Sequence, residues 1–192
     1  RDRLRSRGLG DVYNRQVDMY PMDYEEFRWA LGDTATIPLL RTAFEKKLPL
    51  GDAVHRKLMR DFRLYMLVGG MPQAVSAYIK TNNFSIVDVA KRDIIALYEE
   101  DFGKIDDSGK AKSMYDVIPA QLSKNVLRYQ VGKAIPNEKV DRIINIVKEM
   151  EDSMTVNVAF HSDDPNVGLA LTKNDEYFKM YASDTGLFVT LA

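Results

Sequence analysis

The sequence predicts a mainly α-helical protein, in which a helical bundle is followed by a winged helix-turn-helix with a small β-hairpin. Two observations predict this fold class. From Ile37 to about Ser113, apolar residues recur at helical spacing. Beyond Ser113 come three helical segments and then two short alternating segments that a turn-rich stretch joins. Three helices followed by a two-stranded ribbon is the element order of a winged helix.

The start of the chain predicts a strand that runs directly into a helix. Apolar residues alternate with polar ones up to Met19, as in a half-buried strand, and Pro21 ends this pattern. Asp23 is then placed to accept a hydrogen bond from a free backbone N–H at the start of a helix over 23–32. Because no earlier strand is present to pair with, we interpret residues 1–34 as the end of a domain whose body lies upstream.

Helices alone are predicted for residues 35–108, which we interpret as one bundle. They cover residues 36–48, 52–70, 71–81 and 85–105. Pro72 suits a first helical position, and Ser85 and Asp88 have the spacing of an N-cap and its third following residue. The predicted buried faces are Val54, Leu58, Phe62 and Tyr65 in the second helix, and Val87, Ala90, Ile94, Leu97 and Tyr98 in the fourth.

The polar stretch 106–113 predicts a linker, so that residues 109–192 form the winged-helix domain. Its elements are expected as a helix at 113–123 interrupted near Pro119, a helix at 136–151, strands at 154–160 and 169–173, and a short helix at 183–192.

Composition narrows the class of protein. The chain has 192 residues with 45% hydrophobic content, enough for a buried core. Its 27 Lys and Arg against 28 Asp and Glu give a formal charge of −1, so no global attraction to nucleic acid or anionic membrane is expected. Zero cysteines exclude disulfides and cysteine-ligated metals. With no apolar run long enough to cross a bilayer and no signal peptide, a cytoplasmic protein without membrane contact is expected.

Three patterns invite a catalytic or metal-binding interpretation, and none supports it. The segment Gly103–Ala111 resembles a phosphate loop, but five residues separate its glycines and no hydroxyl follows the lysine. Glu99, Glu100 and Asp101 are consecutive, so on a helix they diverge. Neither histidine has a second one at metal-ligand spacing. We therefore predict no catalytic, cofactor-binding or metal-binding residue in this chain.

Basic residues in the predicted winged helix are the candidate nucleic-acid contacts. They are Lys124, Arg128, Lys133, Lys139 and Arg142. In a winged helix the third helix can enter the major groove while neighbouring basic residues contact phosphates. Asp163 and Asp164 in the predicted wing oppose a phosphate backbone, so a module that binds a protein partner is the alternative.

Five stretches together resemble a known family. They are "MYPMDYEEF", "LVGGMPQAVSAYIKTNNF", "KRDIIALYEEDFGK", "MYDVIPAQLSKNVLRYQV" and "YFKMYASDTGLF". In this order they are similar to prokaryotic AAA-type ATP-binding proteins, which carry an ATPase core and a C-terminal domain of unknown function. The chain departs from the family at Gly10-Asp11, where a Gly-Arg or Gly-Lys pair is usual.

The resemblance implies that this chain is the lid and winged-helix part of such a protein. The ATP-binding and Mg²⁺-binding residues would then lie upstream, and nucleotide state would be coupled to binding of DNA or a protein by the winged helix. A homo-oligomer is a further expectation. The alternative is a stand-alone winged-helix DNA-binding regulator with a helical dimerisation bundle.

Overall fold

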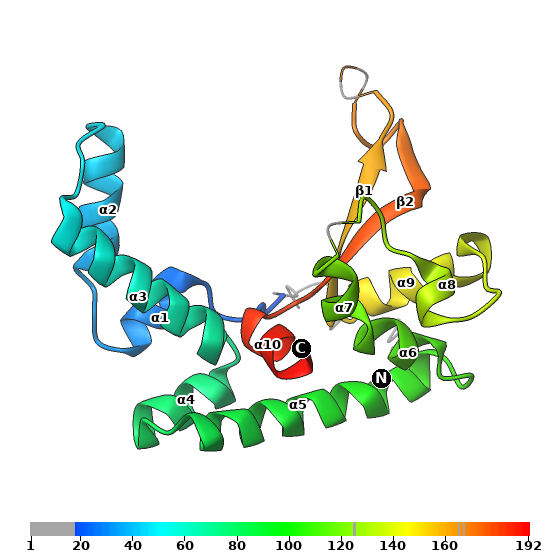
Figure 1. Cartoon of the computed structure of the whole chain (residues 1–192), viewed down its shortest axis with the longest axis horizontal. Helices are drawn as coiled ribbons and strands as arrows, with labels where there is room; N and C mark the ends of the chain where they lie inside the picture. Colours follow the sequence, from blue (N-terminus) through cyan, green and yellow to red (C-terminus); the bar gives the residue numbers. More distant parts are fainter. Residues whose placement is uncertain (1–17, 125, 165, 167) are drawn as a thin grey trace, which may run out of the picture.

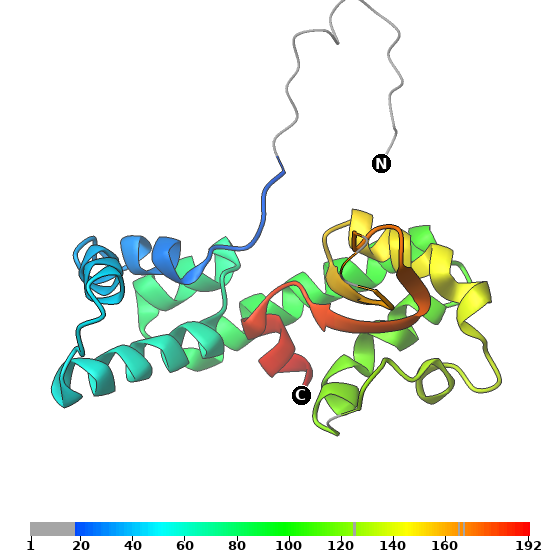
Figure 2. The ribbon, with the colours of Figure 1, turned by 90° about the horizontal axis from the view of Figure 1, so that it is seen from above.

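The computed structural model describes residues 18–124, 126–164, 166 and 168–192. One long helix, α5 (Phe84–Ile105), runs along one side of the molecule and carries a lobe at each end (Figure 1). The last helix, α10 (Thr185–Leu191), returns from the second lobe to the space between the two and packs on α5 (Figures 1 and 2). The chain therefore closes on the helix that separates its lobes.

The first lobe is helical, as predicted. It comprises α1 (Tyr24–Ala30), α2 (Thr36–Glu45), α3 (Asp52–Val68) and α4 (Pro72–Thr81). The Asp23 carboxylate accepts the Glu26 N–H at 2.8 Å, and the Glu26 carboxylate accepts the Asp23 N–H at 3.0 Å, which confirms the predicted helix start. Pro72 begins α4, also as predicted.

The strand expected before Pro21 is not found in its described part. Residues 18–20 have no regular structure, and Met19 is 81% exposed because no neighbouring strand covers it. The rest of that predicted strand, and Gly10-Asp11, lie outside the described residues.

Three details of the predicted helices are wrong. Helix α5 is capped by Asn83, whose side chain accepts the Ser85 N–H at 2.9 Å, and Ser85 itself is helical. Leu97, assigned to its buried stripe, is 54% exposed. Val54 and Phe62 of α3 are each 39% exposed, although the Phe62 ring contacts the Tyr24 ring of α1.

The second lobe combines short helices with a hairpin. It comprises α6 (Lys110–Asp116), α7 (Ile118–Leu122), α8 (Val131–Ala134), α9 (Val140–Asp152), β1 (Val156–Ser162) and β2 (Lys173–Ala182). The predicted break near Pro119 is confirmed by the boundary between α6 and α7. The predicted linker 106–113 is wrong, because α6 begins at Lys110 and Ala111 is fully buried.

The hairpin is antiparallel and is displaced from its predicted position. Val156 pairs with Ala182, Val158 with Met180 and Phe160 with Phe178. The second strand starts at Lys173, where the prediction ended it, because apolar residues 178 and 180 provide the buried face. Tyr129 also donates its N–H to the Phe178 carbonyl at 2.7 Å, which ties the segment before α8 to β2.

Buried side chains form three clusters. One lies in the first lobe around Phe27 and Val75, and one in the second lobe around Tyr115 and Met150. The third joins Ile94 and Ile95 of α5 to Leu187 of α10. The described residues are therefore mainly helical with a small two-stranded antiparallel sheet, which confirms the coarse fold class. None of the described helices is long and apolar enough to span a membrane.

Candidate functional site

The two lobes meet at a buried carboxylate, Asp184, which caps α10. It accepts the Leu187 N–H at 2.9 Å within the first turn of that helix. It also accepts the Gly70 N–H at 2.5 Å, from the turn between α3 and α4. One side chain therefore fixes the start of the last helix to the first lobe.

Three glycines allow the backbones to approach closely enough for this contact. A Cβ atom at Gly69 or Gly186 would overlap the backbone of the other, and one at Gly70 would overlap the backbone of Met22. Gly69 also has φ +85°, which side-chain-bearing residues rarely adopt. The segments "GG" (69–70) and "DTG" (184–186) therefore pack against each other. We call them, together with the residue that contacts Gly70, the junction: Met22, Gly69, Gly70, Asp184 and Gly186.

The segment that enters the first lobe is bonded to the same junction. Met22 donates its N–H to the Gly70 carbonyl at 2.8 Å. The Met22 carbonyl accepts the Tyr65 hydroxyl at 2.9 Å. Hydrogen bonds therefore connect Met22 through Gly70 to Asp184, which caps α10.

A buried lysine lies beside the junction. Lys91 of α5 is 4% exposed and donates to the Leu67 carbonyl at 3.1 Å. Burial lowers the pKa of its ammonium group, and the charges of Asp88 and Asp184 partly offset this. Burial raises the pKa of the Asp184 carboxyl, opposed by the backbone N–H groups that it accepts and by Lys91. Asp184 and Lys91 thus connect α10 and α5 to the end of α3 and to the turn that follows it.

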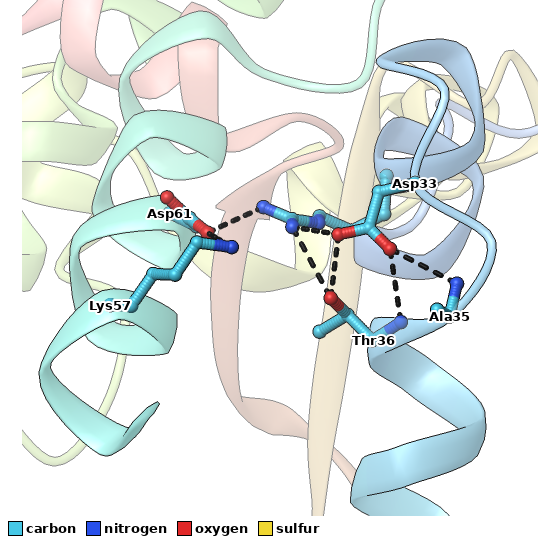
Figure 3. Close-up of polar contacts among 6 residues, drawn as sticks. Asp33, Ala35, Thr36, Lys57 and Asp61 are labelled. Carbon is cyan, nitrogen blue, oxygen red and sulfur yellow. Dashed lines mark hydrogen bonds and ion pairs between the residues drawn. The ribbon is translucent and has the colours of Figure 1, made fainter. Parts of the chain in front are cut away.

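A second polar cluster braces the first lobe at Arg28, which is nearly buried. Its guanidinium forms an ion pair with Asp33 in the α1–α2 loop and another with Asp61 of α3, the latter at 2.7 Å. Figure 3 shows Asp61 and Lys57 on α3 facing Asp33 and Thr36 at the start of α2. Asp33 also accepts the Thr36 hydroxyl at 2.5 Å and the Thr36 and Ala35 N–H groups, which lowers its pKa well below the ordinary 3.8.

The predicted basic contacts are all exposed, and the structure brings only some of them together. Arg128 and Lys139 line one groove of about 620 Å³. Glu138, Asp141 and Glu176 line the same groove, so its charge is mixed. Lys124, Lys133 and Arg142 do not line it, and Arg142 lies 3.8 Å from the Glu138 carboxylate.

Arg128 stacks on the hairpin. Its guanidinium carbon lies 4.5 Å from the centre of the Tyr177 ring, a cation–π contact. His161 lies beside the same ring, with the two ring centres 6.3 Å apart. The exposed face of the hairpin therefore carries an aromatic and basic group next to the mixed-charge groove.

The patterns that resembled catalytic or nucleotide sites have structural roles. In the segment Gly103–Ala111, the Asp106 carboxylate accepts the Lys110 N–H at 2.6 Å and the Ser108 hydroxyl. The Asp106 carboxylate thus already accepts a backbone N–H that a bound phosphate would require. Glu99 pairs with Lys112 at 2.5 Å and Asp101 with Lys104 at 2.6 Å, so these acids line a solvated surface. Among the described residues, no group of three or more His, Asp or Glu could hold a metal ion.

Sequence reasoning did not identify the junction. Asp184 and Gly70 are 114 positions apart, and periodicity carries no information at that separation. Three of the stretches that carry the family resemblance contain the junction residues: "MYPMDYEEF", "LVGGMPQAVSAYIKTNNF" and "YFKMYASDTGLF". The available signal for the junction was a glycine two residues after a possible helix-capping aspartate, because such a glycine indicates close approach of two backbones.

Comparisons with known proteins identify one family of similar sequences. No curated protein and no solved structure shows a significant match to the chain. The sequence profile of a family described as Domain of unknown function (DUF8612) matches residues 59–192, which is more than half of the chain and includes the junction from Gly69 onwards. The chain therefore belongs to the DUF8612 family.

Proposed function

We propose that this chain is the lid and winged-helix part of an AAA-type ATP-binding protein, and that it couples nucleotide state to the binding of a partner. In this proposal ATP and Mg²⁺ are held by an ATPase core outside these residues. The first lobe acts as the helical lid, and the second lobe acts as the winged helix that meets DNA or a protein.

The observation that carries the proposal is that hydrogen bonds hold Met22 within the junction. The chain enters the first lobe at Met22, whose N–H and carbonyl are both held, by Gly70 and by Tyr65. Gly70 in turn donates to Asp184, which starts α10. A nucleotide-dependent movement upstream of Met22 would therefore change the placement of both lobes, as coupling requires.

The order of elements in the second lobe supports the winged-helix assignment. Helices α7, α8 and α9 precede the hairpin, and the segment before α8 joins β2 through the Tyr129 N–H. The segment Gly103–Ala111 does not fit a phosphate, because the Asp106 carboxylate already accepts its Lys110 N–H. No step of the proposal passes through ATP bound to these residues.

The proposal is tested by measuring the ATP affinity of two proteins, which are this chain and the product of the complete reading frame. Calorimetry should detect binding by the longer protein only. Hydrogen exchange in α3, α4 and α10 of that longer protein should then slow when ATP is added. Equal protection with and without ATP would contradict the coupling, and binding by neither protein would contradict the assignment to an ATP-binding protein.

A stand-alone DNA-binding regulator is the second candidate, because Arg128 and Lys139 line one groove. DNA titrations at increasing salt distinguish it. A regulator should show affinity that falls steeply with salt and drops in the variant Arg128→Ala/Lys139→Ala. Lys46→Ala/Lys47→Ala, which removes two exposed charges from the other lobe, is the matched control. The three acids in the groove oppose this candidate, so we place it second.

A further inference from the structure

The first lobe extends a two-helix arm, defined as residues 36–68, away from the rest of the molecule (Figure 1). The arm carries seven Lys and Arg against three Asp and Glu, although the whole chain is nearly neutral. The balance is reversed in residues 84–109, which carry seven Asp and Glu against three Lys and Arg. Charge is therefore segregated between the arm and the long helix.

An exposed stripe follows one face of α3. We call it the basic stripe: Arg56, Met59, Arg60, Arg63 and Met66, all of them exposed. Their spacing of three and four residues places them on one side of the helix. Among the described residues, no ion pair involves these three arginines. Two exposed methionines beside unpaired arginines are a surface that a partner could cover.

A second stripe of opposite charge follows the outer face of α5. We call it the acidic stripe: Ile86, Val89, Asp93, Leu97 and Glu100, all of them exposed. Figure 1 shows both lobes and α10 on one side of α5, so the opposite side is bare. Val89 and Leu97 are 58% and 54% exposed, and no ion pair of the described residues uses Asp93 or Glu100.

Three residues of each stripe match when the helices run antiparallel. Arg56 and Arg63 are seven residues apart, as are Asp93 and Glu100. Met59 lies three residues after Arg56, and Leu97 lies three residues before Glu100. Placing Arg56 opposite Glu100 and Arg63 opposite Asp93 therefore sets Met59 against Leu97. Seven residues span about 10 Å of either helix, so both ion pairs form together.

We propose that the basic stripe of one copy of this chain docks on the acidic stripe of a second copy. Both stripes remain exposed within a single chain, so they do not cover one another there. A nucleic acid would account for the arginines but not for the methionines or for the acidic counterpart. Because the two stripes lie on different elements, two copies either exchange both contacts across a two-fold axis or add further copies until a ring closes or a filament forms. The inference does not depend on the proposed function.

Light scattering after gel filtration tests this with the 192-residue chain over a range of concentrations. The wild type should show a mass that rises with concentration in about 0.05 M NaCl and falls towards one copy in about 0.5 M, because salt screens exposed charges. A wild type that stays at the mass of one copy throughout would overturn the proposal.

Charge reversal makes the test specific. Arg56→Glu/Arg63→Glu and Asp93→Arg/Glu100→Arg should each weaken self-association about tenfold or more, because like charges then face one another. Lys133→Glu/Lys139→Glu, which makes the same charge change as the arginine variant but in the second lobe, should have no effect. Circular dichroism should show that every variant is folded.

Mixing the two reversed variants gives the decisive result. The unchanged acidic stripe of the first variant and the unchanged basic stripe of the second can form the natural contact, so an equimolar mixture should regain association. A mixture that stays at the mass of one copy would overturn the proposal. Reversed variants that associate as well as the wild type would also overturn it.

Discussion

The Asp184 carboxylate accepts the Gly70 N–H at 2.5 Å and so joins two segments that are 114 positions apart. The same carboxylate caps α10 through the Leu187 N–H. The stability of the whole molecule should therefore depend on this side chain more than on an ordinary helix cap.

We expect Asp184→Ala to lower the free energy of unfolding by about 3 kcal/mol. The change removes a helix cap and leaves a buried N–H without an acceptor. Urea unfolding followed by circular dichroism measures the loss. Asp184→Asn retains an acceptor oxygen and should cost clearly less; equal losses in the two variants would contradict the assigned role.

Glycine packing at the junction should be visible as a difference between two Gly→Ala variants. Gly186→Ala should destabilise the protein by about 1–3 kcal/mol, because its Cβ would overlap the backbone at Val68 and Gly69. Gly103→Ala, in a helix with open space around it, should stabilise by about 0.5–1 kcal/mol. Thermal unfolding of both variants measures the two changes, and a Gly186→Ala variant at least as stable as the wild type would show that the close approach is not tight.

Two buried tyrosines should respond differently to loss of the hydroxyl. The Tyr129 hydroxyl donates to the Met114 carbonyl at 2.7 Å, so Tyr129→Phe should cost about 1 kcal/mol. The Tyr115 hydroxyl is buried and finds no hydrogen-bond partner among the described residues. Tyr115→Phe should therefore be neutral or stabilising. Chemical denaturation of the matched pair tests this, and an equal cost at both positions would indicate that Tyr115 has a partner.

Acid should weaken the first lobe through Asp33. Hydrogen bonds from Thr36 and the nearby Arg28 guanidinium hold the pKa of this carboxyl below its ordinary 3.8. Its contribution to stability is then present above pH 3.8 and is lost as the pH falls from there towards the lower pKa of the folded state.

Asp33→Asn should lower stability by about 2 kcal/mol at neutral pH and should reduce the further loss on acidification. Urea unfolding at a series of pH values between neutral and strongly acidic measures both effects. Asp107→Asn, in an exposed turn, is the control for the chemical change itself. An acid dependence in Asp33→Asn that equals the wild type would contradict the role of this carboxyl.

The secondary structure was largely predictable, because its signals are local. Asp23 and Pro72 mark helix starts by their own chemistry, and the break near Pro119 follows from the missing N–H of proline. Strand position was not predictable at the hairpin. Residues 169–173 alternate like a strand, but only Phe178 and Met180 have a core to pack against.

The candidate nucleic-acid contacts also could not be grouped from local sequence patterns. Basic residues could be chosen from the sequence, yet nothing local reveals that Arg128 and Lys139 share a groove with three acids while Lys124 faces elsewhere. The exposure of Leu97 was also hidden, since its spacing is that of a buried stripe and only the absence of a neighbouring helix exposes it.

The sequence by itself determined the helix starts at Asp23 and Pro72 and the break near Pro119, because capping and proline geometry act over a few positions. The tertiary structure alone decided that Met22, Gly70 and Asp184 form one junction and that two oppositely charged stripes stay uncovered. These relationships join residues far apart in the chain, and contact between distant segments depends on how the whole molecule packs.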